Sequence, residues 1–366
     1  MDTVSRIFMQ NKNNDLKPID LGKGESSFNP FDFVDASLSR FDLSIHTNYG
    51  DINGLLSLRN AICQYYKDRF DYDLSPNRVC ITDGASEALT IAFTLLVETN
   101  GEVILSESCF PQYRILTNFL KAHCRFVPLN EFYCIDVDQL STFISPKTCC
   151  MIVNSPSNPY GSVLKREAIE VLTSMRVPII FDEVYQALPL RDENIPSAIS
   201  YTDQHFLVNS FSKSLGIAGF RLGYLIVPES YAERMKNVKS IINMCTSVPV
   251  QLIVEKLFKH WDRLITRHRE MLTQHWEYIQ HEVIKNGFKI LCQPKAGFFI
   301  VVDISQINRD TMTVAIDLAK EFSLNIVPGI DFSYPDPKFL RLNFACPFDQ
   351  IKLALERLNS YFSLNI

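Results

Sequence analysis

Four short and mainly apolar runs recur along the first half of the chain, at residues 79–82, 103–105, 149–153 and 178–181. The stretches between them place apolar residues every three or four positions, which is typical of amphipathic helices. Strands that alternate with helices predict an α/β fold with a mostly parallel sheet. Ligands of such sheets bind beyond the carboxyl ends of the strands.

The pattern changes towards both ends of the chain. Residues 1–18 are polar and without clear period, which predicts an irregular surface arm. Residues 229–285 read as helical with an interruption at Pro249, and the run 251–284 predicts one long amphipathic helix that bridges two domains. A chain of 366 residues is long enough for two domains.

Composition narrows the class of protein. Hydrophobic residues make up 46% and charged residues 21% of the chain, as in globular proteins. The net charge of −5 and the lack of a basic block argue against a nucleic-acid partner. Ten scattered cysteines without a Cys-x-x-Cys pair, and an N-terminus unlike a signal peptide, predict reduced thiols in the cytoplasm. No apolar run is long enough for a membrane span, and the seven histidines form no metal-binding pattern.

The most informative stretch runs from Ser210 to Tyr224, in a loop between two predicted strands. It carries Lys213 among hydroxyl residues and glycines, with Arg221 eight positions later. A desolvated lysine is a nucleophile towards carbonyls, and an arginine binds phosphate with its planar fork. This combination suits pyridoxal phosphate (PLP). On its own the stretch is also readable as a Ser/Gly loop with an exposed lysine and a structural arginine.

Other polar residues follow the predicted strands. The turn at residues 83–87 joins a strand to a helix, which directs backbone N–H groups and the helix N-terminus at one point and forms an anion site. Ser86 is also readable as a plain N-cap. Asp182 ends a buried strand, where a carboxylate is costly unless a cation is near.

These segments together resemble the class I/II aminotransferases, the fold-type I PLP enzymes of the aspartate aminotransferase-like superfamily. The resemblance covers nearly the whole chain, with five segments in family order. It implies a mostly parallel seven-stranded sheet in a large PLP-binding domain at 32–282. It also implies a smaller α+β domain at 283–366, completed by residues 1–31, which include an N-terminal arm.

The resemblance also implies residue roles. Lys213 would hold PLP as an aldimine and move the α-proton, Asp182 would pair with the ring nitrogen, and Tyr185 would bond the ring oxygen. Further cofactor contacts would come from Gly84, Ala85, Ser86, Phe110, Asn158, Ser210, Ser212, Arg221 and, from the partner subunit of a homodimer, Tyr49. Substrate contacts would come from Gly24, Asn158 and Arg341, which grips the α-carboxylate. Ser26 stands where the family usually has proline.

The implied activity is transfer of an amino group between an amino acid and a 2-oxo acid in amino acid metabolism. A PLP-dependent lyase acting on carbon–sulfur bonds, or a decarboxylase, would use the same residues on the same fold. A non-catalytic PLP-binding protein is the third alternative.

Overall fold

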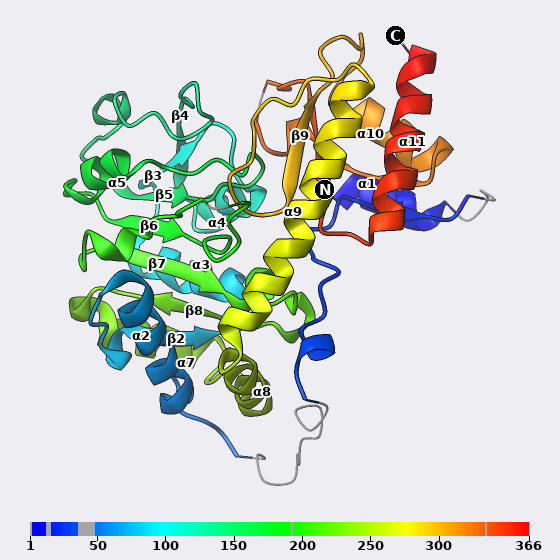
Figure 1. Cartoon of the computed structure of the whole chain (residues 1–366). Coiled ribbons are helices and arrows are strands. Elements are labelled where there is room, and N and C mark those ends of the chain that lie inside the picture. Colours follow the sequence, from blue (N-terminus) through cyan, green and yellow to red (C-terminus); the bar gives the residue numbers. More distant parts are fainter. Residues whose placement is uncertain (1, 12–15, 36–47, 192, 334, 366) are drawn as a thin grey trace.

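The computed structural model describes residues 2–11, 16–35, 48–191, 193–333 and 335–365. Two groups of strands organise them, one of seven strands and one of three, and the long helix α9 (Trp261–Lys285) runs between them (Figure 1).

The seven-stranded sheet has the order β2-β8-β7-β6-β5-β3-β4, and only β8 runs antiparallel to its neighbours. Its strands are β2 Val79–Thr82, β3 Glu102–Ser106, β4 His123–Val127, β5 Thr148–Asn154, β6 Ile179–Asp182, β7 Phe206–Ser210 and β8 Gly223–Ile226. The predicted α/β fold with a mostly parallel sheet is confirmed. The edge strand β4 was not predicted, because its exposed and partly exposed residues include His123 and Arg125.

Helices cover both faces of this sheet. On one face, Ala88, Leu89 and Ala92 of α3 pack with Val208 of β7 and Leu225 of β8. On the other face, helices α2, α8 and the start of α9 bury a second apolar cluster. The helices of this part are α2 Leu56–Phe70, α3 Gly84–Leu96, α4 Pro111–Phe119, α5 Arg166–Thr173, α6 Phe211–Ser214, α7 Ala232–Ile242 and α8 Val248–Phe258, besides α9.

The smaller group of strands is antiparallel, in the order β11-β12-β9. A separate parallel pair, β1 with β10, joins the N-terminal segment to the C-terminal third of the chain. The strands are β1 Ile19–Asp20, β9 Phe299–Asp303, β10 Leu324–Asn325, β11 Val327–Pro328 and β12 Phe339–Asn343, and the helices are α1 Asp2–Gln10, α10 Thr311–Glu321 and α11 Phe348–Asn365. Short 3-10 helices lie at Pro30–Phe33, Pro76–Arg78, Leu140–Thr142, Ala198–Ser200, Ala218–Phe220, Glu229–Tyr231 and Gly329–Asp331.

The prediction of an irregular arm over residues 1–18 is wrong for its first part, which forms α1. Val4 is only 1% exposed, and Ile7 and Phe8 pack against the same core cluster. These positions have the i, i+3, i+4 spacing of an apolar helix face, which packs on α10. The helix is short, and polar neighbours hide this signal in the sequence.

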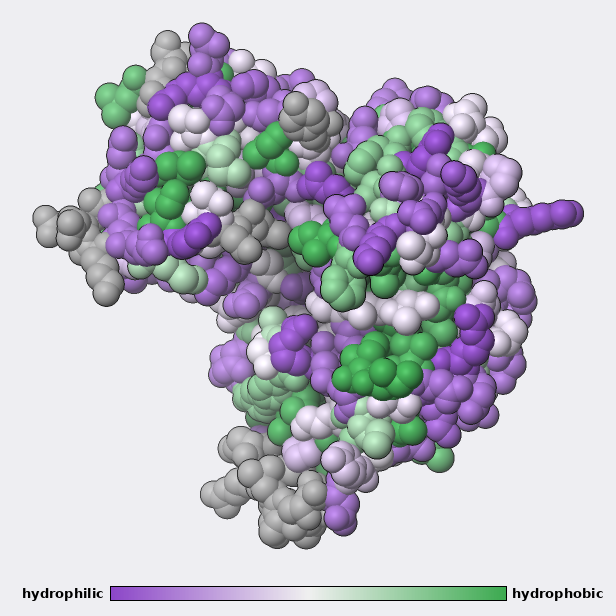
Figure 2. Space-filling model, turned by 180° about the vertical axis from the view of Figure 1, so that it is seen from behind, coloured by the Kyte–Doolittle hydropathy of each residue, from purple (hydrophilic) through white to green (hydrophobic). Residues whose placement is uncertain are grey.

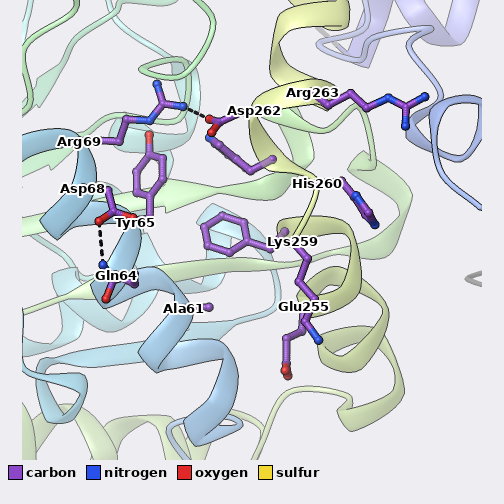
Figure 3. Close-up of a pocket in the computed structure, with 12 residues that line it drawn as sticks. Ala61, Gln64, Tyr65, Asp68, Arg69, Glu255, Lys259, His260, Asp262 and Arg263 are labelled. Carbon is purple, nitrogen blue, oxygen red and sulfur yellow. Dashed lines mark hydrogen bonds and ion pairs between the residues drawn. The ribbon is translucent and has the colours of Figure 1, made fainter.

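The single helix predicted at 251–284 is also wrong, because the chain bends between α8 and α9. No glycine or proline marks the bend. Phe258 and Trp261 lie on either side of it, with ring centroids 4.9 Å apart, and the Tyr65 ring packs against both. A hollow of about 470 Å³ opens beside the bend, and Figure 3 shows Arg69 of α2 reaching across to Asp262 of α9. Tertiary packing therefore sets the break.

Figure 2 shows the face of the molecule opposite to that in Figure 1. Polar and apolar side chains are mixed on this face, and its outline is indented on one side. None of the helices in the described part of the chain is long and apolar enough to cross a membrane. The domain boundaries at 31/32 and 282/283 stay predictions.

Candidate active site

A cavity of about 560 Å³ collects side chains from segments far apart in the sequence. Its wall includes residues that follow β5, β6 and β7, as expected for the carboxyl edge of a parallel sheet. All the predicted site residues except Gly84 and Tyr49 line it: Gly24, Ala85, Ser86, Phe110, Asn158, Asp182, Tyr185, Ser210, Ser212, Lys213, Arg221 and Arg341.

Lys213 lies in the one-turn helix α6, directly after β7. The Ser210 hydroxyl caps this turn by accepting a hydrogen bond from the Ser212 N–H at 3.1 Å. The Lys213 ammonium nitrogen donates to the Gly24 carbonyl at 2.5 Å. Burial, reinforced by Arg341 and Arg221, lowers the pKa of Lys213 to about 8. A larger fraction of this amine than of an ordinary lysine is therefore neutral and nucleophilic near neutral pH.

Asp182 ends β6 and is only 4% exposed. Its carboxylate accepts a hydrogen bond from the Tyr113 hydroxyl at 2.6 Å and a longer one from the Val184 N–H at 3.3 Å. Burial raises the pKa of Asp182 to about 6, against the opposing effect of the Tyr113 hydrogen bond. A cationic group in the cavity would restore the charged form of this carboxyl.

Arg341 enters the cavity from β12 and is 1% exposed. It donates to the Asn158 side-chain oxygen at 3.0 Å and to the Gly22 carbonyl at 2.6 Å, and its guanidinium lies over the Phe299 ring at 4.1 Å. Burial lowers the pKa of Arg341 to about 10, so it remains a cation at neutral pH. Asn158 is held in turn, since its N–H donates to the Asn154 side chain at 2.7 Å.

The turn before α3 faces Arg221. Gly84 has φ +75°, and a Cβ at this position would overlap the Arg221 guanidinium. Arg221 itself has left-handed backbone angles (φ 52°), which are uncommon for a residue with a side chain. Glycine and arginine thus allow the guanidinium and the start of α3 to approach each other, which creates a cationic corner beside Ala85 and Ser86.

Two residues that line the cavity each have a buried polar atom without a hydrogen-bond partner in the described part of the chain. Among the described residues, the Ser212 hydroxyl and the Arg341 Nε are buried and lack a hydrogen-bond partner. Buried polar groups are normally satisfied. An anionic, phosphate-bearing cofactor and a carboxylate substrate supply the acceptors that a guanidinium and a hydroxyl need, so the residues present fit PLP.

Tyr49 lies outside this cavity. Its side chain is 84% exposed and lines a separate hollow with Asn48, Cys245, Thr246, Ser247, Val248 and Pro249.

The sequence did not predict a site role for Tyr113, Asn154 or Glu25, which also line the cavity. The contacts of Tyr113 with Asp182 and of Asn154 with the chain at Asn158 depend on the fold. For Asn154, its position at the end of a buried apolar run was the one feature of the sequence that could have indicated a site role. Tyr113 belongs to the apolar face predicted for α4, and this spacing indicates a core residue instead.

Comparison with known proteins identifies the family of the chain. The sequence profile described as aminotransferase class I and II matches residues 17–358. The chain belongs to this family, whose members depend on PLP, and it is an enzyme, a transaminase. The lyase, decarboxylase and non-catalytic alternatives are not favoured.

Two relatives come from Methanocaldococcus jannaschii. A protein named probable aspartate aminotransferase is 28% identical, over 94% of this chain and 93% of its own. A (5-formylfuran-3-yl)methyl phosphate transaminase is 30% identical, over 95% and 92%. A crystal structure from Methanococcus jannaschii, described as similar in its active site to kynurenine aminotransferases, matches with a TM-score of 0.84 and 28% identity, over 98% of this chain and 95% of the other.

Proposed function

We propose that the chain binds PLP in the 560 Å³ cavity and uses Lys213 to transfer an amino group from an amino acid to a 2-oxo acid. The observation that carries this proposal is the convergence of Lys213, Asp182, Arg221 and Arg341 on one cavity from three segments that are distant in the sequence. Each supplies a group that the chemistry needs: an amine, a carboxylate and two guanidinium forks.

Each side chain has a defined task in this proposal. Bound PLP supplies the electron-withdrawing ring that stabilises negative charge at the α-carbon of the substrate. Asp182 keeps the ring nitrogen protonated, and Tyr185 and Asn158 bind the ring oxygen. Arg341 orients the substrate through its carboxylate. Lys213 would accept the α-proton of the substrate at its Nζ and give it up again as the amino group is transferred.

The phosphate of the cofactor would lie at the corner made by Gly84, Ala85, Ser86 and Arg221, with Ser210 and Ser212 beside it. Phe110 would pack flat against the ring. The corner combines backbone N–H groups at the start of α3 with a guanidinium, which is the environment that a phosphate dianion requires.

The test follows the bound cofactor. Purified protein is mixed in turn with aspartate, glutamate, aromatic amino acids and histidinol phosphate, and acid-released cofactor is separated by chromatography. We expect conversion of PLP to pyridoxamine phosphate with at least one donor, and none in Lys213→Ala. Full conversion in Lys213→Ala would refute the proposal, as would release of pyruvate and ammonia without a 2-oxo acid acceptor.

We also propose a homodimer in which Tyr49 reaches the cofactor phosphate of the partner subunit. The exposure of Tyr49, and of Ile241 (85%) and Met244 (49%) on the neighbouring segment that leads to Cys245, supports a protein partner at this face. Ten free cysteines suit the reducing cytoplasm, where we place the enzyme.

Hybrid dimers test the shared site. Co-expression of Lys213→Ala with Tyr49→Phe gives mixed dimers in which one site carries both substitutions and the other carries neither. We expect the mixed dimers to regain about half of the wild-type activity per dimer. If each site is built from a single chain, mixed dimers regain nothing beyond the average of the two variants, and the proposal fails.

A further inference from the structure

His268 lies in α9, fully buried, between two segments of the cavity wall. Its Nδ1 is 2.8 Å from the Ser214 carbonyl, and its Nε2 is 2.8 Å from the Ser26 hydroxyl. A carbonyl only accepts, so Nδ1 carries the ring proton. Nε2 is then an acceptor, and the Ser26 hydroxyl must donate to it. Burial lowers the pKa of His268 to about 4, which agrees with a neutral ring.

One of the two linked segments, residues 22–26, presents successive carbonyl groups to the site. The Gly22 carbonyl accepts from Arg341 at 2.6 Å, and the Gly24 carbonyl accepts from Lys213 at 2.5 Å. The Lys23 and Glu25 carbonyls both accept hydrogen bonds from the side-chain amide of Asn343, at 2.7 and 2.6 Å. The conformation of this short segment therefore sets the positions of both functional cations.

The other linked segment contains Lys213 itself, since Ser214 is the next residue. Further contacts strengthen the link: the Phe28 ring stacks on His268 with centroids 4.5 Å apart at 7°. Gly216 has φ +68°, and a Cβ there would overlap the Phe28 carbonyl. The chain at 26–28 and the loop after Lys213 are thus in close contact, with the imidazole bonded to both.

We propose that His268 is a positioning residue that fixes the Gly24 carbonyl relative to Lys213 through its hydrogen bonds to Ser26 and Ser214. The inference rests on the proposed role of Lys213.

The first test uses cofactor-free protein. Competitive labelling with acetic anhydride, read by peptide mass spectrometry, gives the pH at which Lys213 loses its proton. A fixed carbonyl acceptor favours the ammonium form. Ser26→Ala and His268→Asn should each lower this midpoint by about 0.5 to 1 pKa unit, as expected for one lost hydrogen bond. An unchanged midpoint in both variants would overturn the proposal.

The second test separates positioning from general damage. His268→Asn keeps a donor for the Ser214 carbonyl but has no atom at the Nε2 position, so it breaks the same bond as Ser26→Ala. Each variant should raise the KM for the amino donor about 3- to 10-fold, and the double variant should be no worse than the single variants. The Kd of PLP should not rise, because the phosphate corner is not touched and a lower Lys213 pKa leaves more of the amine neutral. Additive effects, or loss of PLP affinity without a change in KM, would refute the link.

Matched controls come from the same elements. Ser27→Ala changes the neighbouring exposed serine, and His281→Asn changes an exposed histidine of α9. Both should behave as wild type. Borohydride reduction followed by peptide mapping tells which lysine carries PLP. If this is not Lys213, the proposed function fails, whereas the labelling experiment still decides whether His268 positions Lys213.

Discussion

A buried ion pair beneath the start of α3 offers the sharpest test of how the fold supports the site. Lys239 of α7 is 0% exposed, and its amine lies 2.7 Å from the Glu87 carboxylate and 2.9 Å from the Thr246 hydroxyl. The same Glu87 oxygen accepts from the Asp83 N–H at 2.6 Å. This network joins the turn that would hold the phosphate to the loop beside Tyr49.

The perturbation is Lys239→Met, which keeps most of the side-chain volume and removes the charge. Glu87, 8% exposed, is left as a buried carboxylate without its cation. Breaking a buried pair in this way costs about 3 to 5 kcal/mol, whereas replacing both partners with neutral groups is often close to neutral. We therefore expect Lys239→Met to lower the free energy of unfolding by about 3 to 5 kcal/mol, and Glu87→Gln/Lys239→Met to regain much of it.

The assay is urea unfolding of the cofactor-free protein, followed by fluorescence and circular dichroism, with Lys236→Met on the same helix as the control. The control should stay within about 0.5 kcal/mol. Because Glu87 holds the Asp83 N–H, the single variant should also weaken PLP binding about 10-fold. A loss below about 1 kcal/mol for Lys239→Met, or a double variant as unstable as the sum of the single variants, would refute the reasoning.

Two further predictions concern the cavity. Gly84→Ala places a methyl group against the end of the Arg221 side chain at positive φ, so it should weaken PLP binding about 10-fold or more while the protein still folds. Gly287→Ala, also at positive φ (+82°) but with open space around an added Cβ and outside the cavity, should not weaken it. Equilibrium PLP titration measures both, and equal affinities would contradict the assigned phosphate corner. Because the pKa of Asp182 is raised, the folded cofactor-free protein binds more protons than the unfolded chain between about pH 4 and 6. The stability of the wild type relative to Asp182→Asn should therefore fall by about 2 kcal/mol from pH 4 to 7, and a flat difference in urea titrations would refute the shift.

Much of the fold was predictable because short stretches of sequence, such as apolar runs followed by turns, indicate its strands and helices. The apolar runs at β2, β3, β5 and β6 end in turns, and parallel strands bring such ends to one edge. That rule is enough to place Asp182 and Asn158 near Lys213 without any pairwise contact being known. The turn at residues 83–87 was also visible, as a glycine between a strand and a helix, and the structure places Ala85 and Ser86 at the cavity.

The features that were missed depend on tertiary contacts. Tyr113 has the spacing of a core residue, and only the approach of β6 to α4 gives its hydroxyl the Asp182 carboxylate as a partner. His268 is one of several polar residues on a long helix pattern, and its two partners lie 242 and 54 positions away. The bend before Trp261 likewise carries no breaker residue.

Burial acts on the two central charges of the cavity in opposite senses, and both shifts favour neutrality. It lowers the pKa of Lys213 and raises that of Asp182, so each group loses part of its charge at neutral pH. In the proposed function, PLP would bring the complementary charges: a phosphate dianion for the Arg221 corner and a protonated ring nitrogen for Asp182. At neutral pH this carboxyl is already mostly ionised, and a protonated ring nitrogen beside it would keep it ionised at lower pH as well. Binding and ionisation of Asp182 are therefore linked, and the affinity for PLP should decrease as the pH falls through 6.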